Sequence, residues 1–111
     1  MSVVRRPALR VSVADEGSTT VVALAGELDL ATADVFRDHV KGLLGAHPAP
    51  GRLVIDLGGL EFLDVTGLGA VLETRRKLVS NGGSIALRRP RPMVVRMLGL
   101  LDLETAFEVE Q

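Results

Sequence analysis

Apolar and polar residues alternate along the chain first with a strand period and then with a helical one. Residues 8–13 and 19–25 alternate or carry β-branched runs, and the turn-type sequence Asp-Glu-Gly-Ser lies between them. Together they predict a β-hairpin. Apolar residues between Phe36 and Leu44 then recur at helical spacing, which predicts an amphipathic helix capped near Thr32.

The middle of the chain combines a buried strand with the start of a second helix. Residues 53–55 form a short run rich in β-branched side chains, which predicts a strand buried on both faces. We expect Asp56 to end this strand and residues 58–59, both glycine, to turn the chain. Phe62 and Leu63 are then expected to return to the core.

Asp64 is placed to cap the helix that follows. Its carboxylate can accept hydrogen bonds from the free N–H groups of the first turn, and Leu68, Val71 and Leu72 then recur at helical spacing. The helix is expected to present a positively polarised N-terminus at the end of a buried strand. Such an end suits the presentation of one side chain or contact with an anion.

The rest of the pattern completes an α/β domain. Residues 81–83 end the second helix, residues 84–87 predict another strand, Pro92 opens a third helix, and residues 106–109 predict a final short strand. The order of elements predicts a single domain that spans the whole chain, with a small, mixed, mostly parallel sheet, an N-terminal hairpin and packed helices. Residues 1–7 are expected to form a flexible lead-in.

Composition narrows the possible functions. The formal net charge of −1 and the aromatic content of 3% argue against binding to nucleic acid through a basic field or through base stacking. The absence of cysteine excludes thiolate metal sites and fits a cytoplasmic protein. No apolar run is long enough to insert in a membrane, and His39 and His47 lack metal-ligand spacing. We therefore expect neither a metal nor a cofactor, and a binding module rather than an enzyme.

Two short motifs carry a resemblance to a known family. Residues 64–69 read Asp-Val-Thr-Gly-Leu-Gly and are similar to the Asp-Ser-Ser/Thr-Gly-Leu-Gly signature of STAS domains, especially the anti-sigma factor antagonists of bacteria. Residues 26–29 read Gly-Glu-Leu-Asp and match a second element of that family. Here Gly26 is expected to break the second strand and the next three residues to form a loop. The resemblance covers residues 9–109 and implies the α/β fold predicted above.

The resemblance implies capture of a serine-kinase-type anti-sigma factor and release of a sigma factor. The contact surface it implies consists of Glu27, Asp29, Asp64, Val65, Thr66, Gly67 and Leu68. In the family, the partner kinase phosphorylates the serine directly after the Asp, but Val65 at that position has no hydroxyl. Thr66 remains a candidate for phosphorylation, although the interpretation we prefer is structural, with its hydroxyl bonded locally in the first helical turn or its Cβ packed against the preceding loop.

Other interpretations stay open. Glu27 and Asp29 equally fit solvated loop acids, with Asp29 capping the next segment. An accessory STAS subunit of an ABC-type transporter would dock the same helix start on a transport ATPase. A two-component receiver would use Asp56 as its phospho-acceptor. It would bind magnesium through Asp15 and Glu16, which follow the first predicted strand. A receiver, however, begins with strand, helix and strand, where this sequence predicts a hairpin.

Overall fold

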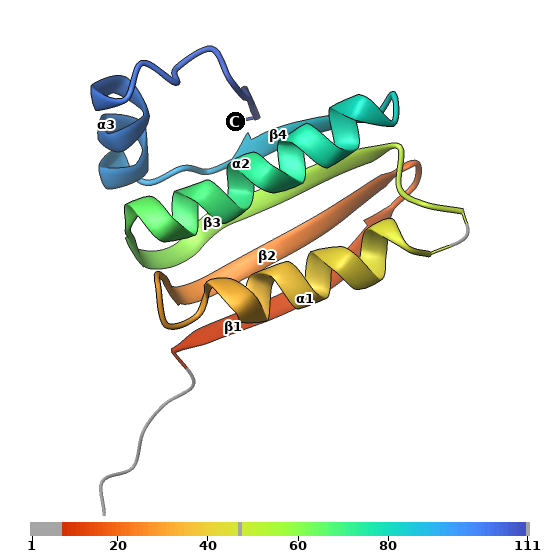
Figure 1. The fold of residues 1–111 in the computed structure, drawn as a ribbon, viewed down its shortest axis with the longest axis horizontal. Helices are drawn as coiled ribbons and strands as arrows, with labels where there is room; N and C mark the ends of the chain where they lie inside the picture. Colours follow the sequence, from red (N-terminus) through yellow and green to blue (C-terminus); the bar gives the residue numbers. More distant parts are fainter. Residues whose placement is uncertain (1–7, 47, 111) are drawn as a thin grey trace, which may run out of the picture.

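The computed structural model describes residues 8–46 and 48–110, so the predicted lead-in at residues 1–7 and His47 lie outside the described residues. Figure 1 shows strands and helices that follow the predicted order. The elements are β1 (Leu9–Glu16), β2 (Thr19–Leu28), α1 (Ala33–Leu44), β3 (Arg52–Leu63), α2 (Val65–Ser80), β4 (Ser84–Arg88), α3 (Pro92–Leu100) and β5 (Glu108–Glu110).

The sheet has the strand order β1-β2-β3-β4-β5. β1 pairs antiparallel with β2, and each of the other neighbouring pairs is parallel, so the prediction of a mixed, mostly parallel sheet with an N-terminal hairpin is confirmed. The parallel pairs follow from the helical crossovers between successive strands. The loops that leave the C-terminal ends of β2 and β3 consequently lie at the same edge of the sheet (Figure 1).

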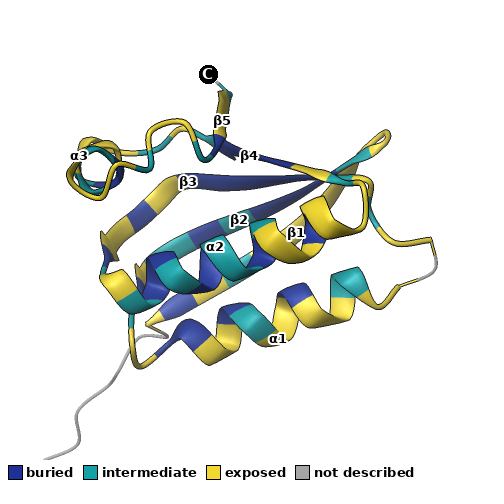
Figure 2. Cartoon of the chain, turned by 45° about the horizontal axis from the view of Figure 1, so that its top comes forward, coloured by how far each residue is buried: buried dark blue, intermediate teal, exposed yellow. Residues whose placement is uncertain are grey.

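The main core lies between the sheet and the two helices that cover one of its faces, α1 and α2 (Figure 1). Phe36 of α1, Ile55 of β3 and Leu68 of α2 are buried there. Figure 2 shows buried positions along β3 and β4 and on the sides of α1 and α2. In the described part of the chain, no helix is long and apolar enough to cross a membrane.

The opposite face of the sheet carries a second, smaller set of buried residues. Val21, Val54 and Ala86 lie beside one another in the strand register and form a separate buried cluster. Because Val54 alternates with core residues on either side of it in sequence, β3 is buried on both faces, as predicted.

Ion pairs flank this row of small apolar side chains. Arg52 bonds Glu108 at 3.0 Å, and Arg88 bonds Glu16 at 3.2 Å and Glu110 at 2.7 Å. Glu110 also contacts Arg52, so the network joins β5 to β3 and β4. The aliphatic stems of the two arginines can thereby shield apolar surface while their charged groups remain in water.

The predicted end of β2 is wrong, because the strand continues past Gly26 to Leu28. Gly26 has a φ of +99°, and a Cβ at this position would lie 2.4 Å from the Ala8 carbonyl oxygen. The strand register shifts between Gly26 and Glu27, and Glu27 then pairs with Phe62. Glu61 of β3 is the extra residue at this shift, so Gly26 lies opposite a bulge in β3 and does not end β2.

The predicted turn in β3 is also wrong. Ala23 pairs with Asp56 and Ala25 pairs with Gly59, so β3 holds one residue more than β2 over this interval. The Asp56 carboxylate accepts a hydrogen bond from the Gly58 N–H at 2.9 Å within this bulge. β3 therefore runs on as one bent strand. Leu63 is buried as predicted, but Phe62 is 48% exposed and does not return to the core.

The interpretation as a two-component receiver is wrong. The chain begins with an antiparallel hairpin, whereas a receiver needs a helical crossover after its first strand. Asp56, the supposed phospho-acceptor, is only 7% exposed and pairs with Arg89, whose Nε donates to its carboxylate at 3.2 Å.

The ion pair at Asp56 generates a pH-dependence prediction. Burial raises the pKa of Asp56, but hydrogen bonds from Arg89 and Gly58 and the charges of Arg89 and Arg88 outweigh it, so the pKa lies below its usual value. A depressed folded-state pKa stabilises the fold above the unfolded-state pKa of about 4, and this stabilisation disappears as the pH falls through the folded-state pKa.

We therefore expect Asp56→Asn to be less stable than the unsubstituted protein near neutral pH, with a difference that narrows in acid. Urea unfolding of both proteins between about pH 7 and about pH 3 measures this difference. A difference in unfolding free energy that stays constant over this range would contradict the assignment.

Candidate functional site

The carboxylate of Asp64 joins two loops at the edge of the sheet. Its Oδ1 accepts a hydrogen bond from the Gly67 N–H at 2.8 Å, so the predicted helix cap is confirmed. Its Oδ2 accepts a second hydrogen bond, at 3.1 Å, from the N–H of Leu30 in the loop after β2. The backbone N–H of Asp64 donates to the Leu28 carbonyl at 3.2 Å. We call these three bonds the Asp64 clasp.

Gly67 allows the two loops to approach this closely. A Cβ at position 67 would lie 2.3 Å from the Leu28 carbonyl oxygen and 2.8 Å from its carbonyl carbon. Both atoms belong to the backbone, so they cannot rotate away as a flexible side chain could. The first turn of α2 therefore rests directly on the end of β2, and only glycine fits at the contact.

The loop between β2 and α1 is ordered by its own polar side chains. The Asp29 carboxylate accepts hydrogen bonds from the N–H groups of Ala31 at 3.0 Å and Thr32 at 3.1 Å. The Thr32 hydroxyl donates to the Glu27 carbonyl at 2.8 Å and accepts from the Asp29 N–H at 3.0 Å. These bonds fix the backbone that carries Leu30.

An ion pair between the two helices supports the same arrangement. Arg37 of α1 bonds Glu73 of α2 at 3.1 Å and Asp34 of its own helix at 3.0 Å. This pair joins the first half of α1 to the middle of α2.

Apolar side chains are exposed around the clasp. Leu30 is 77% exposed, Val65 is 67% exposed, and Phe62 stands beside Glu27 in the strand register. We call this the clasp surface, formed by Glu27, Leu30, Phe62, Val65 and Thr66. Several large apolar groups exposed together on a rigid frame are typical of a protein-binding site.

The residues that the sequence motifs predicted for the contact surface differ in how far they are buried. Glu27 and Val65 are exposed, and Asp29, Asp64 and Thr66 are half-buried at the same edge of the sheet. Gly67 and Leu68 are buried, so they support the surface from beneath. The sequence interpretation missed Leu30 and Phe62. An apolar residue inside a polar loop motif was the available signal for Leu30.

The chain is similar in sequence to known proteins. Residues 11–109 match the family described as "Mlab, STAS domain". The anti-sigma F factor antagonist of Paenibacillus polymyxa is 29% identical over 101 residues, which cover 91% of this chain and 83% of that protein. The anti-sigma-F factor antagonist RsfB of Mycobacterium tuberculosis is 34% identical over 70 residues, or 63% of this chain, and the match spans only 56% of RsfB.

A solved structure supports the same relationship. The crystal structure of an anti-sigma factor antagonist from Mycobacterium paratuberculosis is 29% identical to this chain, with a TM-score of 0.80. The alignment covers 91% of this chain and 84% of that one.

Two glycines in the first turns of α2 should respond to alanine in opposite ways. We expect Gly67→Ala to destabilise the fold by about 2 kcal/mol or more, because the new methyl group meets the Leu28 backbone. Gly69 has no atom within 4 Å of an added Cβ, so Gly69→Ala should stabilise the helix by up to about 1 kcal/mol. Urea unfolding compares the two variants. Equal effects would contradict the close contact at Gly67.

Asp64→Asn separates the helix cap from the link between the loops. The single side-chain oxygen of asparagine can still cap the Gly67 N–H, but its NH₂ group then faces the Leu30 N–H, and two donors cannot bond. We expect helix α2 to persist while amide hydrogen exchange at Leu30 accelerates about fivefold or more, as expected for the loss of a bond worth about 1 kcal/mol. Unchanged exchange at Leu30 would show that the second bond does not hold the loop.

Proposed function

The chain belongs to the STAS domain family, and we propose that it acts as an anti-sigma factor antagonist. It binds a serine-kinase-type anti-sigma factor through the clasp surface and releases a sigma factor in the cytoplasm. The curated relatives named above support the antagonist role. The observation that carries the proposal for this chain is the Asp64 clasp, which holds two exposed loops in one arrangement.

The clasp surface has the properties that protein recognition requires. Leu30 and Val65 can be buried by a partner, and Glu27 supplies an exposed polar side chain near the end of β2. Buried apolar groups at the centre of an interface with polar groups around them are typical of binding hot spots. Because hydrogen bonds already order both loops, binding loses little conformational entropy there.

Val65 determines how such a surface can be regulated. It occupies the position of the serine that a partner kinase phosphorylates in the resembling family, and it has no hydroxyl to accept phosphate. The surface is therefore competent to bind without dephosphorylation at this residue.

Thr66 is the remaining position for a phosphorylation switch. A phosphate there adds about −1.5 to −2 charges at pH 7. The N-terminus of α2 tolerates this charge, because its free N–H groups favour anions. A partner that covers Val65 with apolar surface would bind more weakly to the phosphorylated protein, because binding would remove water from the phosphate charge.

A pair of substitutions on α2 tests the interface. Val65 and Val79 are both exposed, at 67% and 50%, near opposite ends of the helix. We expect Val65→Glu to abolish capture of the partner from native cells, because its charge would be buried in the interface. An acid in the first helical turn favours helix formation, so the fold should persist. Val79→Glu is the control, and it should capture the partner normally.

Mass spectrometry of the captured proteins identifies the partner and reports whether Thr66 carries phosphate. A kinase-type anti-sigma factor lost only by Val65→Glu is the expected result. Undiminished capture by Val65→Glu would exclude the clasp surface as the interface. Capture of a transport ATPase would overturn the antagonist role and support the role of transporter subunit.

A further inference from the structure

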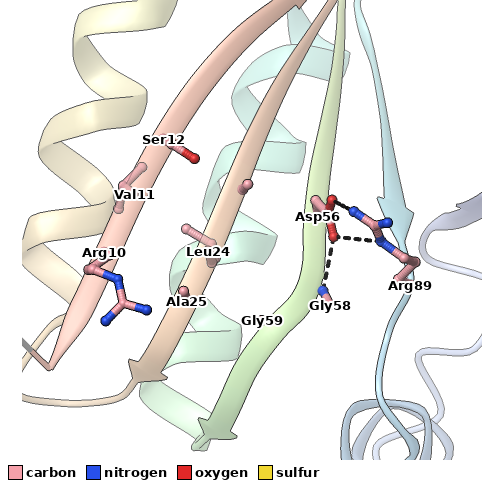
Figure 3. Close-up of a pocket in the computed structure, with 10 residues that line it drawn as sticks. Arg10, Val11, Ser12, Leu24, Ala25, Asp56, Gly58, Gly59 and Arg89 are labelled. Atoms are coloured by element: carbon pink, nitrogen blue, oxygen red, sulfur yellow. Dashed lines mark hydrogen bonds and ion pairs between the residues drawn. The ribbon is translucent and has the colours of Figure 1, made fainter.

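A groove of about 650 Å³ lies on the face of the sheet opposite α1 and α2. It runs across β1, β2 and the bulged part of β3. Figure 3 shows Arg10 on one side of the groove, the Asp56–Arg89 pair on the other, and Ala25 and Gly59 between them. The groove is separate from the clasp surface, which is built on loops at the end of the strands.

The floor of the groove is made of small residues. The strand register places Ser12 beside Ala23 and Ala25 beside Gly59. A Cβ at Gly59 would approach the Leu24 carbonyl oxygen at 3.1 Å, so the floor lies at the level of the backbone. The ion pairs of Arg52 and Arg88 flank the other half of this sheet face. The half that carries the groove has only these small side chains on its floor.

The sides of the groove carry more positive than negative charge. Two guanidinium groups, of Arg10 and Arg89, and one carboxylate, of Asp56, line it. Both oxygens of Asp56 already accept hydrogen bonds from Arg89 or from Gly58. Arg89 bonds Asp56 through Nε and Nη2, and its side chain is 64% exposed. The donors at its Nη1 therefore remain for a ligand.

The backbone of Arg89 has an unusual conformation. Its φ is 51°, in the left-handed region that a non-glycine residue enters at a cost of about 1 kcal/mol or more. The ion pair with Asp56 and a hydrogen bond from its N–H to the Glu110 carbonyl accompany this conformation. One guanidinium group is thus fixed at the edge of the hollow before any ligand arrives.

We propose that this groove binds a small organic anion with a flat apolar body. The volume lies within the range of roughly 300–1,000 Å³ that small-molecule sites occupy. The flat body lies on the floor of alanine and glycine residues, its anionic group pairs with Arg10 on one side of the groove, and Arg89 borders the opposite side. Guanidinium groups suit such an anion, because each offers several donors in a fixed plane. The inference stands independently of the proposed anti-sigma function.

The test uses 8-anilinonaphthalene-1-sulfonate, a fluorescent anion with a flat aromatic body. We expect saturable binding to one site on the folded protein, weakened roughly tenfold by Arg10→Gln through loss of one charge-assisted contact. Ala25→Leu should abolish binding, because its side chain fills the floor. Arg76→Gln removes an exposed arginine from α2, on the other side of the sheet, and serves as the matched control.

Amide spectra of the labelled protein locate the bound probe and confirm that each variant is folded. The signals of Gly58 and Gly59 should shift on addition of the probe, while that of Gly82, in the turn after α2, should not. Absence of saturable binding to the unsubstituted protein would overturn the proposal. So would equal weakening by Arg10→Gln and Arg76→Gln, or normal binding by Ala25→Leu.

Discussion

The two hydrogen bonds accepted by the Asp64 carboxylate hold together the part of the molecule on which recognition depends. One caps the N-terminus of α2, and the other fixes the loop after β2. Each contributes about 1 kcal/mol, a large share for a domain of this size. Their larger effect is geometric, because the bond to Leu30 joins the loop after β2 to the start of α2, 34 residues away in the sequence.

Glycine makes this arrangement possible at three places. Gly67 admits the Leu28 backbone, Gly26 admits the Ala8 carbonyl, and Gly59 lies against the backbone of β2. Two of these positions, Gly26 and Gly59, lie at register shifts between β2 and β3, where an added residue in β3 bends the strand. The groove lies beside the first of these register shifts, and Phe62 is exposed just after the second.

Local sequence predicted the elements well, because strand periods, helix periods and the cap at Asp64 depend on near neighbours. The family motif supplied most residues around the clasp. The pair Gly58-Gly59 led to the wrong prediction of a turn. Two glycines permit either a turn or a bulge, and only pairing with the neighbouring strand decides between them. The bond between Leu30 and Asp64 spans 34 residues, and nothing in the spacing of either motif reveals it. Phe62 was wrongly expected in the core, because the bulges upstream of it in β3 were not predicted.

We propose that the two loops joined by Asp64 bind one partner as a unit. Hydrogen–deuterium exchange of the protein, alone and in complex with the anti-sigma factor it captures, tests this most directly. We expect the amides of residues 27–32 and 64–68 to become protected together, while those of the strands that form the groove do not change. Protection of only one loop, or protection confined to the groove, would contradict it.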